Sequence, residues 1–456
     1  MKRKIYLSIV LISFTISGFS QFFPVEINYV VPPYGHYPEF ISIVDESNIW
    51  LGTLSNGPYS YAVHTDDGGD TWLLDSIPAQ GNPYVSSVFA VDANTCYYVF
   101  TDNGSGGSIW KTGNKGASWE DKTGPLFSSP GAYADFFVAF NANEGVAVGD
   151  PTLGYFEIQL TADGGDTWNR VDSSLIPAIL PGEMGATNAF SVVGDIIWFP
   201  TLIPDDNGNY SSRCFKSVDR GQHWTATPII ADNLGWVTID FSTSAKGVLL
   251  DPNPHVISGK KPFYHTSDGG DNWNIDSLSL DLKSYTGLSS VEGFDGGFVV
   301  GTNGTSGYST DIFFTPDFFS TVLAIDSNLQ AIPWGLEFKD AATGWLEGTG
   351  SNANAVYKYN GLLTSISSAA RSPEKMVIIP NPTSTEAIVK LPGMNDLNNL
   401  SLMIYDATGK LRETRPVESS TGWTKLNASS YTNGVYFLEV VSGNRLIAST
   451  KWVVHH

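Results

Sequence analysis

Short segments in which hydrophobic and polar residues alternate recur along most of the chain. Examples are "YSYAVHT", "YFEIQLT" and "PFYHT". Alternation with a period of two is typical of a half-buried β-strand, because successive side chains point to opposite faces. Longer segments such as "FISIVDESNIWLGT" (40–53) and "FVAFNANEGVAVGD" (137–150) place a short polar turn between two such runs and predict β-hairpins. The pattern predicts an all-β fold.

A short phrase with a terminal tryptophan repeats after these strands. Five copies align, with their tryptophans 47, 49, 56 and 49 residues apart, and a sixth copy, "TPDFFSTV" (315–322), is degraded. The five are "TDDGGDTW" (65–72), "TGNKGASW" (112–119), "TADGGDTW" (161–168), "SVDRGQHW" (217–224) and "TSDGGDNW" (266–273). Repeats of 40 to 50 residues, each with four strands, are typical of propeller blades.

Each period is interpreted as four strands, A to D, with the phrase in the C–D turn. Seven A–B hairpins begin near residues 40, 86, 137, 188, 238, 287 and 335, which predicts a seven-bladed β-propeller over residues 21–366. The last blade has a C strand, "AVYKYNG", but no phrase after it. Its outer strand comes either from the N-terminus ("PVEINYVV", 24–31) or from "LLTSI" (362–366), and both alternatives stay open.

The repeated phrase resembles the Asp-box, the bacterial neuraminidase repeat, and the resemblance covers residues 22–366. It implies that the aspartate accepts backbone N–H groups within the turn, that glycine adopts a positive φ, and that tryptophan packs between sheets. A phrase present in five or six blades cannot form five or six active sites, so a structural role is expected. The residues are Asp67, Trp72, Asn114, Trp119, Asp163, Trp168, Asp219, Trp224, Asp268 and Trp273.

The last 82 residues have a different pattern. After a linker at 367–374, the segment 375–456 contains "IIPNPTSTEAIVKLP", "LSLMIYDATGKLRE" and "TNGVYFLEVVSGNRLIASTKWVV" in that order. Alternating strands and an Asp-Ala-Thr-Gly turn predict a small β-sandwich. The order of these motifs closely resembles the C-terminal sorting domain of the type IX secretion system. The resemblance implies the secretion machinery as a partner, passage across the outer membrane of a Gram-negative bacterium, and removal of the tail.

Composition and the N-terminus add limits to this picture. Residues 1–20 combine "MKRK" with the apolar run "IYLSIVLISFTI" and small residues up to Ser20, which predicts a cleaved signal peptide. A net charge of −21 disfavours nucleic acid as a partner. The two cysteines, Cys96 and Cys214, fall in separate repeats and are expected to be buried thiols. No metal or cofactor motif is found, and a monomeric propeller is expected.

Aromatic residues precede strand A in six of the seven blades. On the face away from the Asp-boxes, which carries the B–C and D–A loops, they would ring the mouth of the central channel and could stack on sugars or hold a peptide. The alternative is that they pack between blades. The six are Tyr37, Tyr84, Tyr133, Trp236, Tyr285 and Trp334.

Carboxylates in the same loops are the candidates for catalysis. Asp150 and Asp251 end B strands, and Glu183 lies in the longest D–A loop. Two such groups at a suitable distance could cleave a glycosidic bond. Family sialidases use an arginine triad, and the propeller segment 21–366 contains only Arg170, Arg213 and Arg220, which lie beside or inside boxes and are expected on the opposite face.

Three functions are compatible with these patterns. The first is an exported or surface-displayed binding propeller for a glycan or protein ligand. The alternative is a glycoside hydrolase, xyloglucanase-like or sialidase-like, that acts on extracellular polysaccharide. A third is an assembly factor like the propellers that help to build photosystem II, which share this repeat, although the export and sorting signals count against it. We expect the binding protein.

Overall fold

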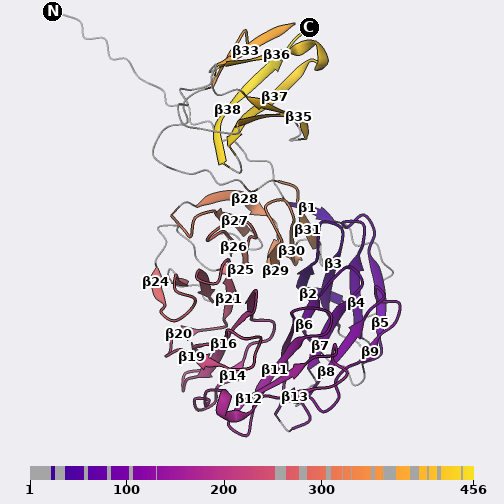
Figure 1. Ribbon diagram of the computed structural model, residues 1–456, viewed down its shortest axis with the longest axis vertical. Helices are drawn as coiled ribbons and strands as arrows, with labels where there is room; N and C mark the ends of the chain where they lie inside the picture. Colours follow the sequence, from indigo (N-terminus) through magenta and orange to yellow (C-terminus); the bar gives the residue numbers. More distant parts are fainter. Residues whose placement is uncertain are drawn as a thin grey trace, which may run out of the picture.

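The computed structural model describes eighteen stretches of the chain, and the predicted signal peptide and linker lie outside them. Figure 1 shows the strands in two bodies, a large one that ends with β31 and a small one that contains β33 and β35–β38. The described residues are 22–25, 36–55, 60–79, 84–101, 106–129, 131–251, 263–276, 285–303, 310–320, 322–329, 331–350, 355–361, 363, 376–390, 400–407, 410–417, 423–442 and 445–456.

The first three sheets of the large body each consist of four antiparallel strands in chain order. Their innermost strands are β2, β6 and β10, which correspond to the predicted A strands. The bounds are β2 (His36–Ile43), β3 (Ile49–Ser55), β4 (Ser60–Thr65), β5 (Leu73–Ile77), β6 (Tyr84–Ala90), β7 (Cys96–Thr101), β8 (Gly107–Thr112), β9 (Glu120–Asp121), β10 (Ala134–Ala139), β11 (Gly145–Thr152), β12 (Tyr155–Thr161) and β13 (Asn169–Arg170).

The fourth sheet is larger, because three loops add short strands to the core of the blade. A 3₁₀ helix, η1 (Ser173–Leu175), begins the long loop before this blade, and seven strands share the sheet. They are β14 (Met184–Gly185), β15 (Ser191–Val193), β16 (Ile196–Pro204), β17 (Tyr210–Ser212), β18 (Cys214–Ser217), β19 (Thr225–Ala226) and β20 (Ala231–Leu234). Strand β14 comes from the long loop, β17 from the loop between β16 and β18, and β20 from the segment after β19.

The fifth and sixth sheets return to four strands in chain order. The fifth consists of β21 (Thr238–Phe241), β22 (Gly247–Leu250), β23 (Phe263–Thr266) and β24 (Asn274–Asp276), and the sixth of β25 (Tyr285–Ser290), β26 (Phe298–Asn303), β27 (Thr310–Thr315) and β28 (Leu323–Leu329).

The seventh sheet joins the two ends of the propeller sequence. Its order is β1-β31-β30-β29, with β1 (Phe22–Val25), β29 (Ala331–Phe338), β30 (Gly344–Gly350) and β31 (Ala355–Tyr359). Strand β1 is antiparallel to β31, and Phe22 lies opposite Tyr359. The N-terminal alternative for the closing strand is therefore the one observed, although the strand ends at Val25 and residues 26–31 lie outside the described residues. The β-propeller fold is established, and the seven sheets in the described residues support the predicted number of blades.

The predicted hydrogen bonds of the Asp-box are present. Asp67 Oδ1 accepts the Thr71 backbone N–H at 2.8 Å, and Thr71 Oγ1 donates to Asp67 Oδ2 at 2.6 Å. The hydrogen bonds from Thr71 hold the pKa of Asp67 at about 2. Gly68 and Gly69 have φ values of 73° and 92°, in the region that favours glycine. The equivalent bonds occur at Asn114, Asp163, Asp219 and Asp268.

Box turns and A–B turns lie on one face of the ring, as predicted. In the first blade Gly68 N donates to Ser47 O at 3.0 Å, and in the third Gly164 N donates to Asn143 O at 2.8 Å. The same bond links the two turns of each of the first six blades. The B–C and D–A loops therefore lie on the other face of the ring.

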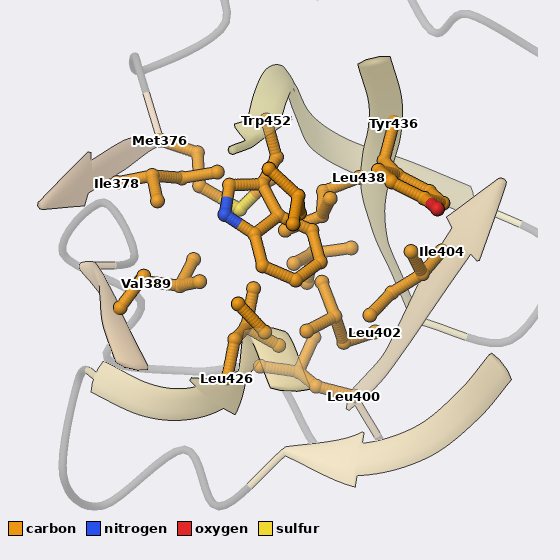
Figure 2. Close-up of a cluster of buried hydrophobic side chains, with 14 residues drawn as sticks. Met376, Ile378, Val389, Leu400, Leu402, Ile404, Leu426, Tyr436, Leu438 and Trp452 are labelled. Carbon is orange, nitrogen blue, oxygen red and sulfur yellow. The ribbon is translucent and has the colours of Figure 1, made fainter. Parts of the chain in front are cut away.

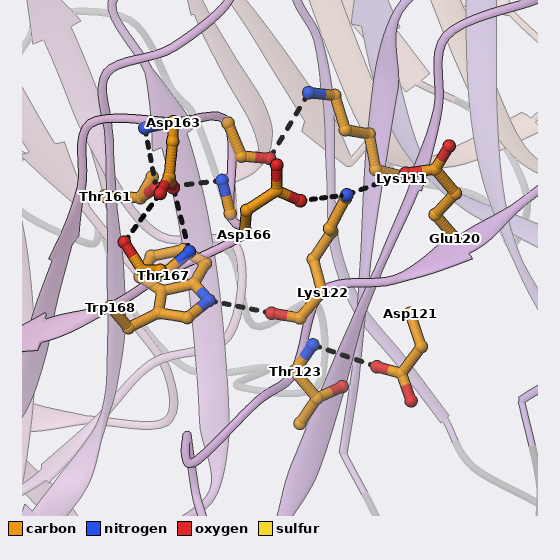
Figure 3. Close-up of polar contacts among 12 residues, drawn as sticks. Lys111, Glu120, Asp121, Lys122, Thr123, Thr161, Asp163, Asp166, Thr167 and Trp168 are labelled. Atoms are coloured by element: carbon orange, nitrogen blue, oxygen red, sulfur yellow. Dashed lines mark hydrogen bonds and ion pairs between the residues drawn. The ribbon is translucent and has the colours of Figure 1, made fainter.

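Each box also binds the sheet before it. Lys111 Nζ, on the second sheet, donates to Gly164 O at 3.2 Å, and Trp168 Nε1 donates to Lys122 O at 2.8 Å, as Figure 3 shows. Lys122 Nζ in turn pairs with Asp166 at 2.5 Å. Across the closure of the ring, Lys358 Nζ donates to Gly68 O at 2.7 Å. These contacts fix the order in which neighbouring sheets pack.

The box tryptophans pack between sheets. Trp72 is 4% exposed, and its ring meets that of Trp345 on the seventh sheet edge-to-face at 5.8 Å. Trp168 packs on Phe137 of its own sheet, and Phe137 in turn meets Tyr97 of the second sheet at 4.3 Å. Trp273 packs on Phe241 in the same way, and Phe241 stacks on Trp198 of the fourth sheet at 3.8 Å. Cys96 and Cys214 are buried free thiols, as expected.

The small body is a β-sandwich. One sheet has the order β32-β33-β36 and the other β35-β34-β37-β38. The buried Trp452 lies at the centre of its core, where Leu426 and Leu438 surround it (Figure 2), and Trp452 Nε1 donates to Thr383 Oγ1 at 2.9 Å. The bounds are β32 (Val377–Ile379), β33 (Glu386–Lys390), β34 (Leu400–Asp406), β35 (Leu411–Val417), β36 (Trp423–Asn427), η2 (Ala428–Ser430), β37 (Gly434–Ser442) and β38 (Arg445–Val454).

Candidate functional site

A cavity of about 1000 Å³ lies on the axis of the propeller, and we call it the channel. Six innermost strands contribute to its wall, namely β2, β6, β15, β21, β25 and β29, together with residues that flank β15. It runs along these strands, from Trp236 just before β21 to Glu292 and Lys339 just after β25 and β29. The innermost strands thus bring residues from six blades to one space.

The innermost strands are sheet edges, so their inward N–H groups have no strand to pair with. Polar side chains of the neighbouring blade accept five of them instead. The bonds are Ala90 N to Ser42 Oγ at 3.0 Å, Phe241 N to Ser191 Oγ at 2.9 Å, Ser290 N to Asp240 Oδ2 at 2.5 Å, Phe338 N to Ser289 Oγ at 2.8 Å and Ile43 N to Glu337 Oε1 at 3.2 Å. The wall of the channel therefore carries polar side chains among apolar ones, and these polar side chains also hold the blades together.

Two acids of this wall have raised pKa values. Burial raises the pKa of Glu337 to about 8, against the opposing effect of the Ile43 N–H bond. Burial also raises the pKa of Asp240, although Ser290 N, Ser191 Oγ and Phe241 N donate to its carboxylate. Glu337 is thus a neutral carboxylic acid at pH 7, and the three hydrogen bonds to Asp240 oppose the effect of its burial.

Trp236 is the predicted aromatic residue that lines the channel. Its side chain is 38% exposed. Its backbone N–H donates to Asp251 Oδ1 at 3.2 Å, and the Gly235 N–H donates to Asp251 Oδ2 at 3.0 Å. Asp251, a candidate catalytic acid in the sequence, is buried and uses both oxygens to hold the backbone that carries Trp236.

The other predicted aromatics are not brought to the channel in the described part of the wall. Tyr84 is 40% exposed and Tyr133 is half-buried, and neither lines the cavity. The side chains of Tyr37, Tyr285 and Trp334 lie outside the described ones, so the predicted ring of six aromatics stays a prediction for these positions.

Glu183 and Arg213 form a buried ion pair. Arg213 Nη2 lies 2.6 Å from Glu183 Oε2, and Arg213 Nε donates to Glu183 Oε1 at 2.7 Å. Thr201 Oγ1 donates to the same carboxylate at 2.6 Å. The expected position of Arg213 on the box face was wrong, because it precedes strand β18 and reaches the long D–A loop. Arg170 likewise reaches away from the boxes, to Thr152 Oγ1 at 2.7 Å.

Asp150 has a close acidic neighbour in Asp135. Asp150 Oδ1 accepts the Gly185 N–H at 2.7 Å, and burial raises its pKa to about 6. Asp135 is 2% exposed, and burial together with the nearby Asp150 holds its pKa well above the usual range. A side chain at Gly185 would clash with the Asp135 carboxyl, so Gly185 covers it. Each of the three candidate acids, Asp150, Asp251 and Glu183, binds its own structural partner. The described structure does not place the three carboxyl groups in one site.

Sequence reasoning missed the polar residues of the channel wall. Ser42, Asp240 and Glu337 each lie three residues before the first residue of the A–B turn, at Asp45, Thr243 and Asp340. A polar or acidic side chain near the end of a strand that must face the axis was the available signal. Among the described residues no group of three or more His, Cys, Asp or Glu is suitably placed for a metal ion, and no helix is long and apolar enough to span a membrane.

Comparisons with known proteins support the assignment of both the propeller and the C-terminal domain. Residues 377–455 match the family model of the secretion system C-terminal sorting domain. The structure of YCF48 bound to D1 peptide is 14% identical, covers 76% of this chain and 97% of its own, and superposes with a TM-score of 0.52. A GH74 xyloglucanase from Xanthomonas campestris is 10% identical, with 91% of this chain and 72% of its own covered and a TM-score of 0.48. A Hadza microbial sialidase is 13% identical, covers 68% of this chain and 76% of its own, and superposes with a TM-score of 0.42.

No curated protein matches the sequence. The chain is a β-propeller protein with a C-terminal secretion sorting domain. That domain implies handling by the type IX secretion system and export to the cell surface or the medium.

Proposed function

We propose that the protein is an exported binding protein and that its extracellular ligand, a glycan or a protein segment, enters the channel of the propeller. The observation that carries the proposal is the channel itself, a cavity of about 1000 Å³ that combines polar and apolar side chains, with the partly exposed Trp236 in its wall. Binding sites are concave, combine aromatic side chains with a few polar groups, and lie where several elements converge. YCF48, a propeller of similar fold, has been solved with a bound D1 peptide, which supports a peptide as one class of ligand.

A glycoside hydrolase is the less supported alternative. Its two carboxyl groups would have to flank a sugar ring with their oxygens available for proton transfer. Instead, Asp251 binds two backbone N–H groups, and Glu183 forms an ion pair with Arg213. Asp150 accepts the Gly185 N–H. These partners favour structural roles for the three acids, so binding is the function that the geometry supports best.

The test compares the mature wild-type protein with a Trp236→Ala variant on glycan and peptide arrays. We expect a ligand whose affinity falls at least about fivefold in the variant, since a partly exposed aromatic contact contributes on the order of 1 kcal/mol. Ile275→Ala is the matched control, because Ile275 is 68% exposed on β24 and does not line the channel. Equal affinity of all three proteins for every ligand found would overturn the proposal. A reducing-sugar assay on glycan hits tests the hydrolase.

A further inference from the structure

Glu337 lines the channel, and one oxygen of its carboxyl has no hydrogen-bond donor in the described part of the chain. Oε1 accepts the Ile43 N–H, whereas no donor among the described residues lies within hydrogen-bond distance of Oε2. A neutral carboxylic acid keeps its proton on the oxygen that does not accept an N–H, which is Oε2 here. Glu337 therefore presents an O–H to the channel at neutral pH, and a carboxylate if that proton leaves.

The charges around this group favour a cation. The described residues of the channel wall include three acidic ones, Asp240, Glu292 and Glu337, and one basic one, Lys339. Lys339 lies at the end of the channel, 45% exposed, and pairs with Glu292 at 3.4 Å. Asp240, on β21, repels the negative charge of a Glu337 carboxylate, and this repulsion adds to the effect of burial on the pKa of Glu337. A ligand that brings a positive charge removes this repulsion, and the net charge of −21 favours its approach.

We propose that the channel binds a cationic group, the ammonium of a lysine or the guanidinium of an arginine in an extracellular protein, at the carboxylate of Glu337. The cation replaces the proton on Oε2, so that one proton is released to the solvent for each cation bound. Trp236, in the same wall, presents a ring to a cation that enters. The inference rests on the proposed binding function and states which chemical group of the ligand enters the channel.

The exchange makes binding depend on pH. Only the ionised form of Glu337 can pair with the cation, and its pKa is about 8 in the unliganded protein. Apparent affinity then rises about tenfold from pH 6 to pH 7 and levels off above pH 8. The other charged groups near Glu337 are Asp240 on β21, Glu292 after β25, Lys339 after β29 and the buried Glu347 on β30 beside Gly335.

The experiment uses butylammonium as the cation and 1-butanol as its neutral analogue. Isothermal titration calorimetry of the mature protein at pH 7, in two buffers with different ionisation enthalpies, measures affinity and proton release together. The variants are Glu337→Gln, whose amide oxygen still accepts the Ile43 N–H, and Glu46→Gln, which removes one exposed charge outside the channel. The protein is kept in about 150 mM salt to screen non-specific attraction.

The expected result is saturable binding of butylammonium with proton release close to one in the wild type and in Glu46→Gln. Glu337→Gln should bind at least about tenfold more weakly, because a charged hydrogen bond is lost, and should release no proton. Equal binding by the two variants, or equal affinity for 1-butanol, would overturn the inference. If the affinity for an array ligand falls in Trp236→Ala but not in Glu337→Gln, this inference is refuted and the proposed binding function stands. Binding of butylammonium through Glu337 without any array ligand refutes only the proposed function.

Discussion

Glu337 accepts the backbone N–H of Ile43 at 3.2 Å, and the two residues are 294 positions apart in the sequence. The bond joins the innermost strand of the last sheet to that of the first. At the outer edge of the same sheet, β1 pairs with β31, so both chain ends of the propeller meet in one sheet. The ring is closed at its inner edge by a side chain and at its outer edge by a strand.

The stability of the propeller should fall as pH rises from about 5 to 8. The pKa of Glu337 is about 8 in the folded protein and ordinarily 4.5. In this interval the unfolded chain has lost a proton that the folded protein keeps, so folding becomes less favourable as pH rises, and the loss is complete above pH 8. It amounts to about 2–5 kcal/mol. Urea unfolding at pH 5, 7 and 9 measures it.

Glu337→Gln is the control for this pH dependence. The amide cannot ionise, so the variant should be more stable than the wild type at pH 9 and close to it at pH 5. A smaller slope should remain because burial also raises the pKa of Asp240. If the variant and the wild type lost the same free energy between pH 5 and pH 9, Glu337 would not be the group that titrates.

Replacing Trp72 by alanine should destabilise the junction of the first and last sheets. Trp72 is 4% exposed and packs on Trp345. Truncation of a buried aromatic costs about 3–5 kcal/mol, which differential scanning calorimetry detects as a lower melting temperature. The next residue provides the control, because Leu73 is 46% exposed and Leu73→Ala should change stability by less than about 1 kcal/mol. Wild-type stability of Trp72→Ala would contradict the packing role.

The ion pair between Glu183 and Arg213 should behave as a buried structural contact. Arg213→Ala leaves the fully buried Glu183 carboxylate without its cation, and we expect a loss of about 3–5 kcal/mol. A double variant, Glu183→Gln with Arg213→Met, should regain much of this, because no uncompensated charge remains. Lys115→Ala, which breaks an exposed pair with Asp66, should cost less than about 1 kcal/mol. Chemical denaturation measures the free energy of unfolding of each variant. Equal losses in Arg213→Ala and Lys115→Ala would be inconsistent with a buried ion pair.

The repeat made most of the propeller predictable from sequence. The boxes fixed the strand period, the position of the C–D turns and the bonds of Asp67, because a short polar turn forms from local contacts alone. The sorting domain was also predictable, since its motifs lie in one continuous segment, and residues 377–455 match the family model. Features that repeat, or that are local, were the ones that could be derived.

The candidate site was harder to predict, because it depends on contacts between blades. Glu183 and Arg213 are 30 residues apart and meet only after the long D–A loop folds over the fourth sheet. Their distance along the chain gave no sign of an ion pair, and Arg213 was therefore expected on the wrong face. Glu337 was missed for the same reason, since its partner Ile43 belongs to the other end of the propeller.

The Asp67 carboxylate should stabilise its turn only while it is ionised. Its pKa is about 2 in the folded protein and 3.8 ordinarily, so the stabilisation is present above pH 4 and disappears as pH falls through 2. Asp67→Asn should therefore melt at a lower temperature than the wild type at pH 5, and the difference should shrink towards pH 2. Asp66→Asn, at the neighbouring position, is the control. Loss of ligand binding in a folded Asp67→Asn protein would assign the box a functional role.

Deletion of residues 375–456 should leave a folded propeller that is not released from the cell. The propeller closes through β1 and β31 without any strand from the tail, so the truncated protein should resist limited proteolysis like the intact one. In a bacterium that has type IX secretion it should accumulate in the periplasm, because residues 377–455 carry the sorting domain. Trp452→Ala, which removes the centre of the sandwich core, should also reduce export, whereas Lys425→Ala, at an exposed position, should not. Normal amounts of the truncated protein in the medium would refute a sorting role for the tail in this chain.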